Sequence, residues 1–241
     1  MISEATTIHD IATAFPEAAR VFDRAGIDYG CGVVQTLREA CQAANLEVEA
    51  VIQQIKHLTD KAHETGTQPD WGSQSLHRIV THVLDVHHKY LDEELPRLEK
   101  LMNKVYETHG KTYGELLRVH EVFFGLKDEL ESHLRKEEAM LFPYILRLEY
   151  AQHQGLPRPS CPFGTVANPI RVMLREHESA EDAMQAIRNE TSDYTPPPDT
   201  CLGFKLLLHG LEALEHDLTR HLQLENQVLF PKAIELETHS E

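Results

Sequence analysis

Apolar residues at helical spacing fill most of the chain after about residue 74. In four stretches, hydrophobic residues recur at every third or fourth position, which places them along one face of an α-helix. The pattern predicts four long helices, at about residues 74–106, 113–150, 166–189 and 199–237. Pro96 lies inside the first of them. It should kink or interrupt that helix, because proline has no N–H and crowds the preceding turn.

The first 60 residues carry a different pattern, in which short helical segments alternate with breaks. Pro16 suits the first turn of a helix, and Gly26 suits its C-terminal stop. Two further short helices are predicted near residues 35–44 and 47–58. These segments indicate a small helical N-terminal domain at residues 1–60.

A polar stretch separates the two patterns. Residues 59–75 read TDKAHETGTQPDWGSQS, and this mixture of glycine, proline and polar residues is typical of a connecting segment. We therefore expect an all-α protein in which a linker at residues 61–75 leads into a helical bundle at residues 76–241.

A polar motif lies at the centre of the second and fourth long helices. HLRKEEAMLFP starts at His133 and HLQLENQVLFP starts at His221, so both copies read His-x-x-x-Glu and then Leu-Phe-Pro. Residues four apart on a helix lie on one face, about one turn from each other. Each copy therefore points an imidazole and a carboxylate in one direction, while its Leu-Phe-Pro predicts only packing and a kink.

The repeat is larger than the motif. His88 precedes His133 by 45 residues, and His177 precedes His221 by 44. Each half then reads as a helical hairpin with one His on its first helix and a His-x-x-x-Glu pair on its second. Two packed hairpins give an up-down-up-down four-helix bundle whose inward side chains can hold metal. The predicted ligands are His88, His133, Glu137, His177, His221 and Glu225.

Four imidazoles and two carboxylates suit a pair of first-row metal ions. Each ion would take two His, with Glu137 and Glu225 as bridging carboxylates of the reactive unit. Positions left open on the two ions could take dioxygen or nitric oxide. A single His on an apolar face is more often an ordinary core residue, so the prediction depends on the duplicated spacing. Periodicity alone does not decide which histidine of the first helix is the ligand, because His87 lies closer to the middle of the apolar stripe than His88.

Composition narrows the class of protein. The formal net charge of −16 argues against nucleic acid and anionic membranes as partners, since both require a basic surface. The N-terminal sequence MISEATTIHD lacks the pattern of a signal peptide, and no run is long enough to span a membrane. We expect a cytoplasmic protein, and sixteen histidines fit metal binding.

Several motifs together resemble the RIC (repair of iron centres) family, bacterial di-iron proteins with a hemerythrin-like bundle. The similarity covers almost the whole chain. It comprises, in order, DYGCG at residues 28–32, Asp70-Trp71, HLRKEE…LFP, REH at residues 175–177, TPPP at residues 195–198 and HLQLEN…LFP. The resemblance implies an oxo-bridged non-heme centre of two iron ions, and it selects His88 over His87 as the first-helix ligand.

The same resemblance implies a function in nitrosative and oxidative stress. The protein would restore damaged iron-sulfur clusters, by iron donation or by enzymatic reduction of nitric oxide at the di-iron site. Its partners would be damaged iron-sulfur proteins, nitric oxide or dioxygen as small ligands, and an electron donor that the sequence does not identify. A homodimer is compatible with the sequence. The alternative is a hemerythrin-like protein that binds or senses dioxygen or nitric oxide.

Two positions distinguish this chain. The family usually has two adjacent cysteines in the first turn, whereas Gly30 precedes Cys31 here, so a mechanism that needs a vicinal pair is in doubt. Cys31 stays a candidate thiol, beside the alternative of a small buried turn residue. Glu138 follows Glu137 whereas Asn226 follows Glu225, which predicts one ion in a more negative setting and readier to leave.

Overall fold

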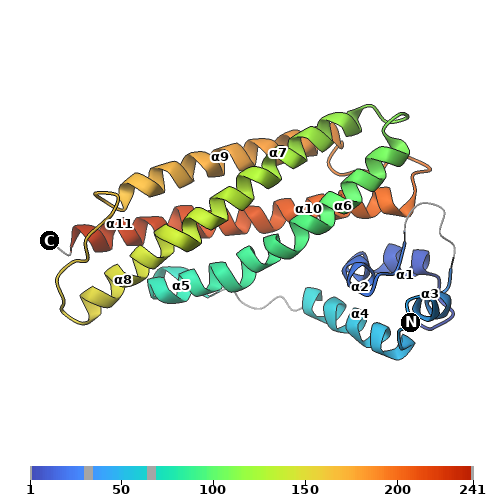
Figure 1. Cartoon of the computed structure of the whole chain (residues 1–241), viewed down its shortest axis with the longest axis horizontal. Coiled ribbons are helices and arrows are strands. Elements are labelled where there is room, and N and C mark those ends of the chain that lie inside the picture. The colour runs from blue at the N-terminus through green and yellow to red at the C-terminus, as the bar shows by residue number, and fades with distance from the viewer. Residues whose placement is uncertain (1, 30–34, 64–68, 240–241) are drawn as a thin grey trace.

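The computed structural model describes residues 2–29, 35–63 and 69–239, and it confirms the all-α fold. Four long rods form an up-down-up-down bundle (Figure 1). The first rod comprises α5 (Leu76–His82), η2 (Val83–His88) and α6 (Lys89–His109). The second comprises α7 (Glu115–Lys136), η3 (Glu137–Leu141) and α8 (Phe142–His153). The third is α9 (Ala167–Glu190), and the fourth comprises α10 (Leu202–Leu224), η4 (Glu225–Leu229) and α11 (Phe230–Thr238).

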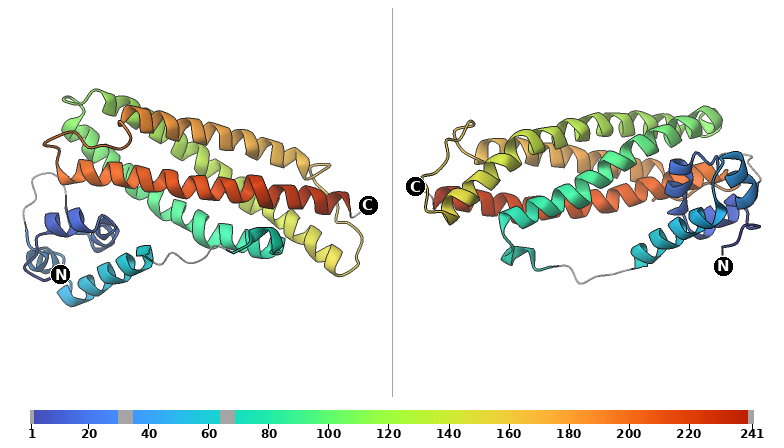
Figure 2. Two further views of the ribbon diagram at one scale, coloured as in Figure 1. Left: turned by 180° about the vertical axis from the view of Figure 1, so that it is seen from behind. Right: turned by 60° about the horizontal axis from the view of Figure 1, so that its bottom comes forward.

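The rods pack in a closed ring. α6 contacts α7, α7 contacts α9, α9 contacts α10, and α10 returns to α6. Successive rods run in opposite directions, and the described C-terminal end lies at the end of the bundle far from the small domain (Figures 1 and 2). The two predicted hairpins therefore lie side by side, and side chains from all four rods reach the centre of the bundle.

Three of the rods contain a π-helical segment, η2, η3 or η4. π-Turns inside α-helices are rare and occur often at functional sites. In η3 and η4 the first residue accepts a hydrogen bond from the fifth residue after it, a phenylalanine in both cases. Pro143 and Pro231 follow directly. The carbonyl that each proline would crowd lies in the wider turn, which explains why Leu-Phe-Pro accompanies both motifs.

The expected interruption at Pro96 is wrong. α6 is helical on both sides of this proline, and the irregular segment of the first rod is η2, which ends at His88. A proline inside a helix removes one hydrogen bond, and the long regular turns on either side of Pro96 keep α6 intact.

The N-terminal domain comprises α1 (Ile8–Ala14), α2 (Ala18–Ala25), α3 (Leu37–Ala43) and α4 (Val48–His63). Gly26 ends α2 in the left-handed conformation with φ of 68°, as predicted. Thr36 and Glu39 form a capping box at the start of α3, in which each side chain accepts the backbone N–H of the other. α4 extends five residues beyond its predicted end, and the division at residues 60 and 75 stays a prediction.

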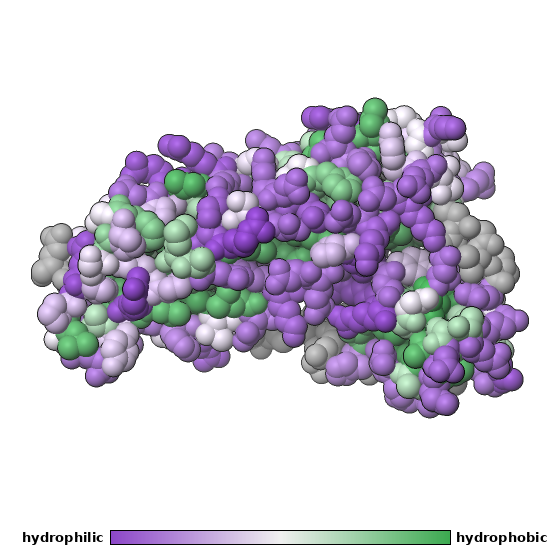
Figure 3. Space-filling model, in the orientation of Figure 1, coloured by the Kyte–Doolittle hydropathy of each residue, from purple (hydrophilic) through white to green (hydrophobic). Residues whose placement is uncertain are grey.

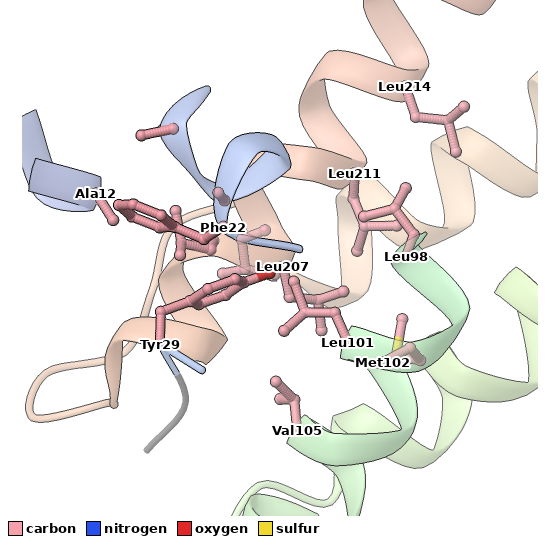
Figure 4. Close-up of a cluster of buried hydrophobic side chains, with 14 of the residues drawn as sticks. Ala12, Phe22, Tyr29, Leu98, Leu101, Met102, Val105, Leu207, Leu211 and Leu214 are labelled. Carbon is pink, nitrogen blue, oxygen red and sulfur yellow. The ribbon is translucent and has the colours of Figure 1, made fainter. Parts of the chain in front are cut away.

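The apolar interior consists of two clusters on either side of the predicted ligands. The shared core joins the small domain to the bundle, and Phe22 and Tyr29 point toward Leu101 and Leu207 (Figure 4). The same cluster includes Ala12, Leu98, Met102, Val105, Leu211 and Leu214. The distal core lies at the opposite end and includes Leu76, Ile79, Tyr144, Ile145 and Phe230. Both clusters are excluded from water, so the predicted ligands lie in a polar layer between two dry regions.

A network of charges around the buried Glu94 carboxylate also joins the two domains. The Arg97 Nε atom donates to Glu94 Oε2 at 3.0 Å, and the Arg97 Nη1 atom lies 3.4 Å from Asp23 Oδ2. Arg20 of the small domain contacts the same Glu94 carboxylate at 3.2 Å. The Tyr29 hydroxyl donates to Asp23 at 2.8 Å. The small domain is thus attached to α6 by ion pairs as well as by the shared core.

Hydrophilic side chains cover most of the face seen in Figure 3, as the strongly negative net charge leads one to expect. Among the described residues, no helix is both long enough and apolar enough to cross a membrane.

Candidate metal centre

The structure brings all six predicted ligands together at the centre of the bundle. Each is at most 2% exposed. Their ligand atoms form two sets of four, and the atoms of each set lie within 4.8 Å of one another. One set is His88, Glu137, His221 and Glu225, and the other is His133, Glu137, His177 and Glu225. We call them position A and position B.

Glu137 belongs to both positions through a single oxygen. Its Oε2 atom lies 3.4 Å from His88 Nε2, at position A, and 3.4 Å from His133 Nε2, at position B. Glu137 is the first residue of η3. A wide π-helical turn therefore lies between this ligand and the regular helix α8 that follows.

Glu225 joins the two positions through both of its oxygens. Its Oε1 atom lies 3.2 Å from His221 Nε2, and its Oε2 atom lies 3.3 Å from His177 Nε2. Glu225 is also the first residue of its π-segment, η4. Each carboxylate therefore contacts one imidazole from each position, which is the arrangement that a bridging ligand requires.

The layer contains polar atoms that no protein group satisfies. His88 Nε2, both carboxylate oxygens of Glu137 and Glu225 Oε2 are buried and have no hydrogen-bond partner. Leaving such groups unpaired costs about 1–3 kcal/mol each, and more when they are charged. Neighbouring donor atoms lie 3.1–3.4 Å apart, and ligands at about 2.1 Å from one ion have edges of this length. The donor set therefore fits two first-row metal ions.

The titratable groups in this layer lie close together, and they shift the pKa values of the imidazoles in opposite directions. Burial alone would lower the pKa of His133, but the close negative charge of the Glu137 carboxylate raises that pKa to about 9. Burial and the charge of His133 lower the pKa of His177 to about 4. Burial and the charge of His88 lower the pKa of His221 to about 3.

The two carboxylates also differ. Burial alone would raise the pKa of Glu137, but the close imidazoles of His133 and His88 hold it well below its usual range. Burial and the neighbouring charge of Glu137 raise the pKa of Glu225 well above its usual range. Cations in this layer would replace protons as the compensating charge, which couples metal binding to proton release.

Three of the four imidazoles are oriented by an oxygen on their outer side. His133 Nδ1 lies 2.9 Å from Glu176 Oε2, and the other oxygen of Glu176 accepts from Lys136. Glu138 Oε1 contacts His88 Nδ1 at 2.8 Å, and Asn226 Oδ1 contacts His177 Nδ1 at 2.7 Å. Such partners fix the ring and raise its strength as a ligand.

His87 lies beside the centre but belongs to neither set of four. Its Nδ1 atom lies 3.1 Å from Asp217 Oδ2, and its ring stacks on His221 with 5.1 Å between centroids and 2° between planes. The roles of Glu176 and Asp217 were not foreseen from the sequence. Their only signal is position, one residue before His177 and one turn before His221. Cys31, the candidate thiol, lies outside the described residues, and its role stays a prediction.

Comparison with known proteins identifies both parts of the chain. Residues 79–233 match the Hemerythrin HHE cation binding domain, and residues 4–59 match a domain of unknown function, DUF542. The fold, the buried His and Glu layer and this match together define the bundle as a hemerythrin-like cation-binding domain.

Relatives extend the match to nearly the whole chain. The iron-sulfur cluster repair protein YtfE of Escherichia coli O17:K52:H18 is 32% identical over 225 residues, which are 93% of this chain and 94% of the relative. Proteins with the same description from Shigella boydii serotype 4 and Citrobacter koseri match with the same identity and coverage. The chain belongs to this family of iron-sulfur cluster repair proteins, as the resemblance to the RIC proteins predicted.

Proposed function

We propose that this protein repairs damaged iron-sulfur clusters and that it holds two iron ions in the polar layer of its bundle. The observation that carries the proposal is the layer itself, in which six buried side chains converge and several of their polar atoms lack any protein partner. The relatives that match almost the whole chain are described as iron-sulfur cluster repair proteins, which supports the same conclusion.

Each side chain has a definite task in this proposal. His88 and His221 would hold the ion at position A, and His133 and His177 the ion at position B. Glu137 and Glu225 would bridge the two positions and offset their positive charge. When bound, the iron ions supply redox and Lewis-acid chemistry. The shared core and the distal core keep bulk water away from the layer on both sides.

Both activities implied by the sequence would use this centre. Iron donation to damaged iron-sulfur proteins and reduction of nitric oxide are the two routes that we retain, with nitric oxide or dioxygen as small ligands. The oxo bridge also remains part of the proposal, and the near-ultraviolet absorption of the iron-loaded protein tests it.

The test is to remove both bridges. We expect Glu137→Ala together with Glu225→Ala to abolish stoichiometric iron binding, because each position loses two of its four protein ligands. Iron per chain would be measured on purified protein, and repair would be measured as recovered activity of an iron-sulfur enzyme damaged by nitric oxide.

A matched control removes two glutamates that lie on exposed faces of the same rods. Glu121→Ala together with Glu235→Ala should leave both iron content and repair unchanged. Retention of two iron ions by the bridge variant would contradict the ligand assignment. Full repair by that variant without iron would contradict the proposed function.

A further inference from the structure

The two hairpins differ at one pair of corresponding positions. In the second hairpin, the residue before the first-helix ligand His177 is Glu176, and in the first hairpin the residue before His88 is His87. Glu176 reaches across to the imidazole of the other hairpin, His133, and accepts its Nδ1–H. By the internal repeat, His87 faces His221 in the same way.

His87 does not provide the same support. Its ring stacks flat on His221, and its Nδ1 atom is directed to Asp217 instead. The Nδ1 atom of His221 is consequently buried without a hydrogen-bond partner. Position A therefore contains the one imidazole of the four whose outer nitrogen has no partner, and both imidazoles of position B are supported.

This difference has a direct consequence for metal binding. A hydrogen bond from the outer nitrogen to a carboxylate or amide orients a ligand imidazole and raises its basicity, and its loss typically weakens metal binding by about 10- to 100-fold. Glu138 supports His88, the other imidazole of position A, so His221 is the ligand imidazole that lacks an outer partner. Position A, beside Glu138, is also the position that the sequence places in the more negative setting and predicts to lose its ion more readily, and that expectation stays a prediction.

A cavity adjoins the unsupported imidazole. It has a volume of about 420 Å³, and Trp71, His82, His87, Asp217, Gln223 and Gln227 contribute to its walls. His87 stands between this cavity and His221, since it lines the one and stacks on the other. A second cavity lies outside Glu176, but there the carboxylate is tied to both His133 and Lys136.

We infer that the two ion positions are unequal and that position A is the exchangeable one, with His87 as the positioning residue that leaves His221 unsupported. The inference rests on the proposed function and extends it, because it names which iron ion is available for donation. Position B would retain its ion while position A is emptied and refilled.

The test uses the full chain loaded with two iron ions, reduced and mixed with an excess of the ferrous chelator ferrozine. We expect release in two phases of one ion each. His87→Gln should slow the fast phase by about tenfold, because an amide there can donate to Asp217 and accept from His221. The reciprocal change Glu176→His should accelerate the slow phase, because it removes the support of His133.

His82→Gln is the matched control, since it alters the same cavity without touching a ligand and should leave both phases unchanged. Release of both ions in one phase by the unsubstituted protein would overturn the inference, as would an unchanged fast phase in His87→Gln or an equal slowing in His82→Gln. A protein that binds two ions and releases them together retains the proposed function. If the protein binds no iron at all, the proposed function itself is contradicted.

Discussion

Two buried glutamates show how single residues fix the ends of the rods. Glu149 accepts hydrogen bonds from the backbone N–H groups of Leu76 and His77, at 2.6 and 2.8 Å, at the start of the first rod. Glu237 accepts the Val166 N–H at the start of the third rod. The two glutamates are 88 residues apart, the same separation as the two His-x-x-x-Glu motifs. A carboxylate at a helix N-terminus satisfies otherwise unpaired N–H groups.

Glu237 should make stability depend on pH. Burial alone would raise its pKa, but hydrogen bonds from Thr165, Tyr144 and the Val166 N–H hold that pKa below its usual value. The stabilisation is therefore present above the ordinary carboxyl pKa and is lost as pH falls through the lower folded value. Glu237→Gln should cost about 1–3 kcal/mol at pH 7.

Urea unfolding at pH 7 and in acid checks this prediction. The difference between the parent protein and Glu237→Gln should shrink as the pH falls, whereas the exposed Glu235→Gln on the same helix should have little effect at either pH. A difference of equal size in acid would show that the Glu237 charge contributes nothing.

The ligand residues could be read from the sequence because spacing along a helix fixes which residues share a face. His133 and Glu137 are four residues apart in a strong apolar stripe, so their common direction followed without a structure. The choice between His88 and His87 did not follow, because one residue turns a helix by only a quarter of its circumference. The roles of Glu176 and Asp217 could not be predicted from spacing along one helix. Glu176 contacts His133 and Asp217 contacts His87, and each of these imidazoles belongs to another rod.

At the scale of elements, the long rods follow their predicted ranges closely and the π-segments do not. Apolar spacing of three to four residues reports which face is buried, and one wide turn changes this spacing by a single residue. The prolines after η3 and η4 are the available signal, but a proline in a helical sequence predicts only a kink and not a wider turn. The α-helical period thus predicted the rods but not the turns that begin at Glu137 and Glu225.

The contact between α6 and α10 depends on a glycine. A Cβ atom at Gly210 would lie 2.6 Å from Leu98 Cδ2 and 2.8 Å from Arg97 Nη2. Gly210→Ala should therefore destabilise the protein by about 1–3 kcal/mol, because the rods must separate or repack.

Gly125 in α7 is the matched control, since a Cβ atom there meets nothing within 4 Å. Gly125→Ala should stabilise the protein by about 0.5–1 kcal/mol through helix propensity alone. Both free energies of unfolding can be measured with urea. Equal effects of the two substitutions would show that the rods at Gly210 are not closely packed.

At the scale of the whole molecule, the polar layer divides the apolar interior into the shared core and the distal core. Six buried His and Glu side chains weaken the interior where they lie unless ions compensate them. Iron removal by a chelator should therefore lower the melting temperature by several degrees, since free iron at 100 times its dissociation constant adds about 2.7 kcal/mol.

Differential scanning calorimetry of the iron-loaded and chelator-treated protein measures this effect. Glu137→Ala with Glu225→Ala is the comparison, because its melting temperature should not respond to added iron. Equal melting temperatures of the two forms of the parent protein would contradict a stabilising role of the ions.

The attachment of the small domain was not predictable from the chain. The apolar faces of α2 and α6 each looked like ordinary core, and nothing in their spacing showed that they pack on each other in the shared core. The charged residues gave no signal either, because Asp23 is far from Arg97 in the sequence and Arg20 is far from Glu94.

Loss of Arg97 should destabilise the junction between the small domain and the bundle. Arg97→Met removes one of the two arginines that contact the buried Glu94 carboxylate, and leaves only Arg20. It should destabilise the protein by about 1–3 kcal/mol, because hydrogen bonds to a buried charged group are lost. Arg24→Met breaks an exposed pair with Glu93 and should cost less than about 1 kcal/mol. Urea unfolding of both variants tests the contrast, and equal costs would mean that the network is dispensable.

The fusion of the two hairpins into one chain has a consequence for what the centre can become. Two separate, identical hairpins related by a twofold axis would supply the same four His and two Glu, but symmetry would make every feature of one ion site recur at the other. Glu176 beside one site and His87 beside the other are then impossible. In a covalently joined pair each half can mutate on its own. Under the inference above, a single polypeptide would therefore hold one ion firmly and release the other.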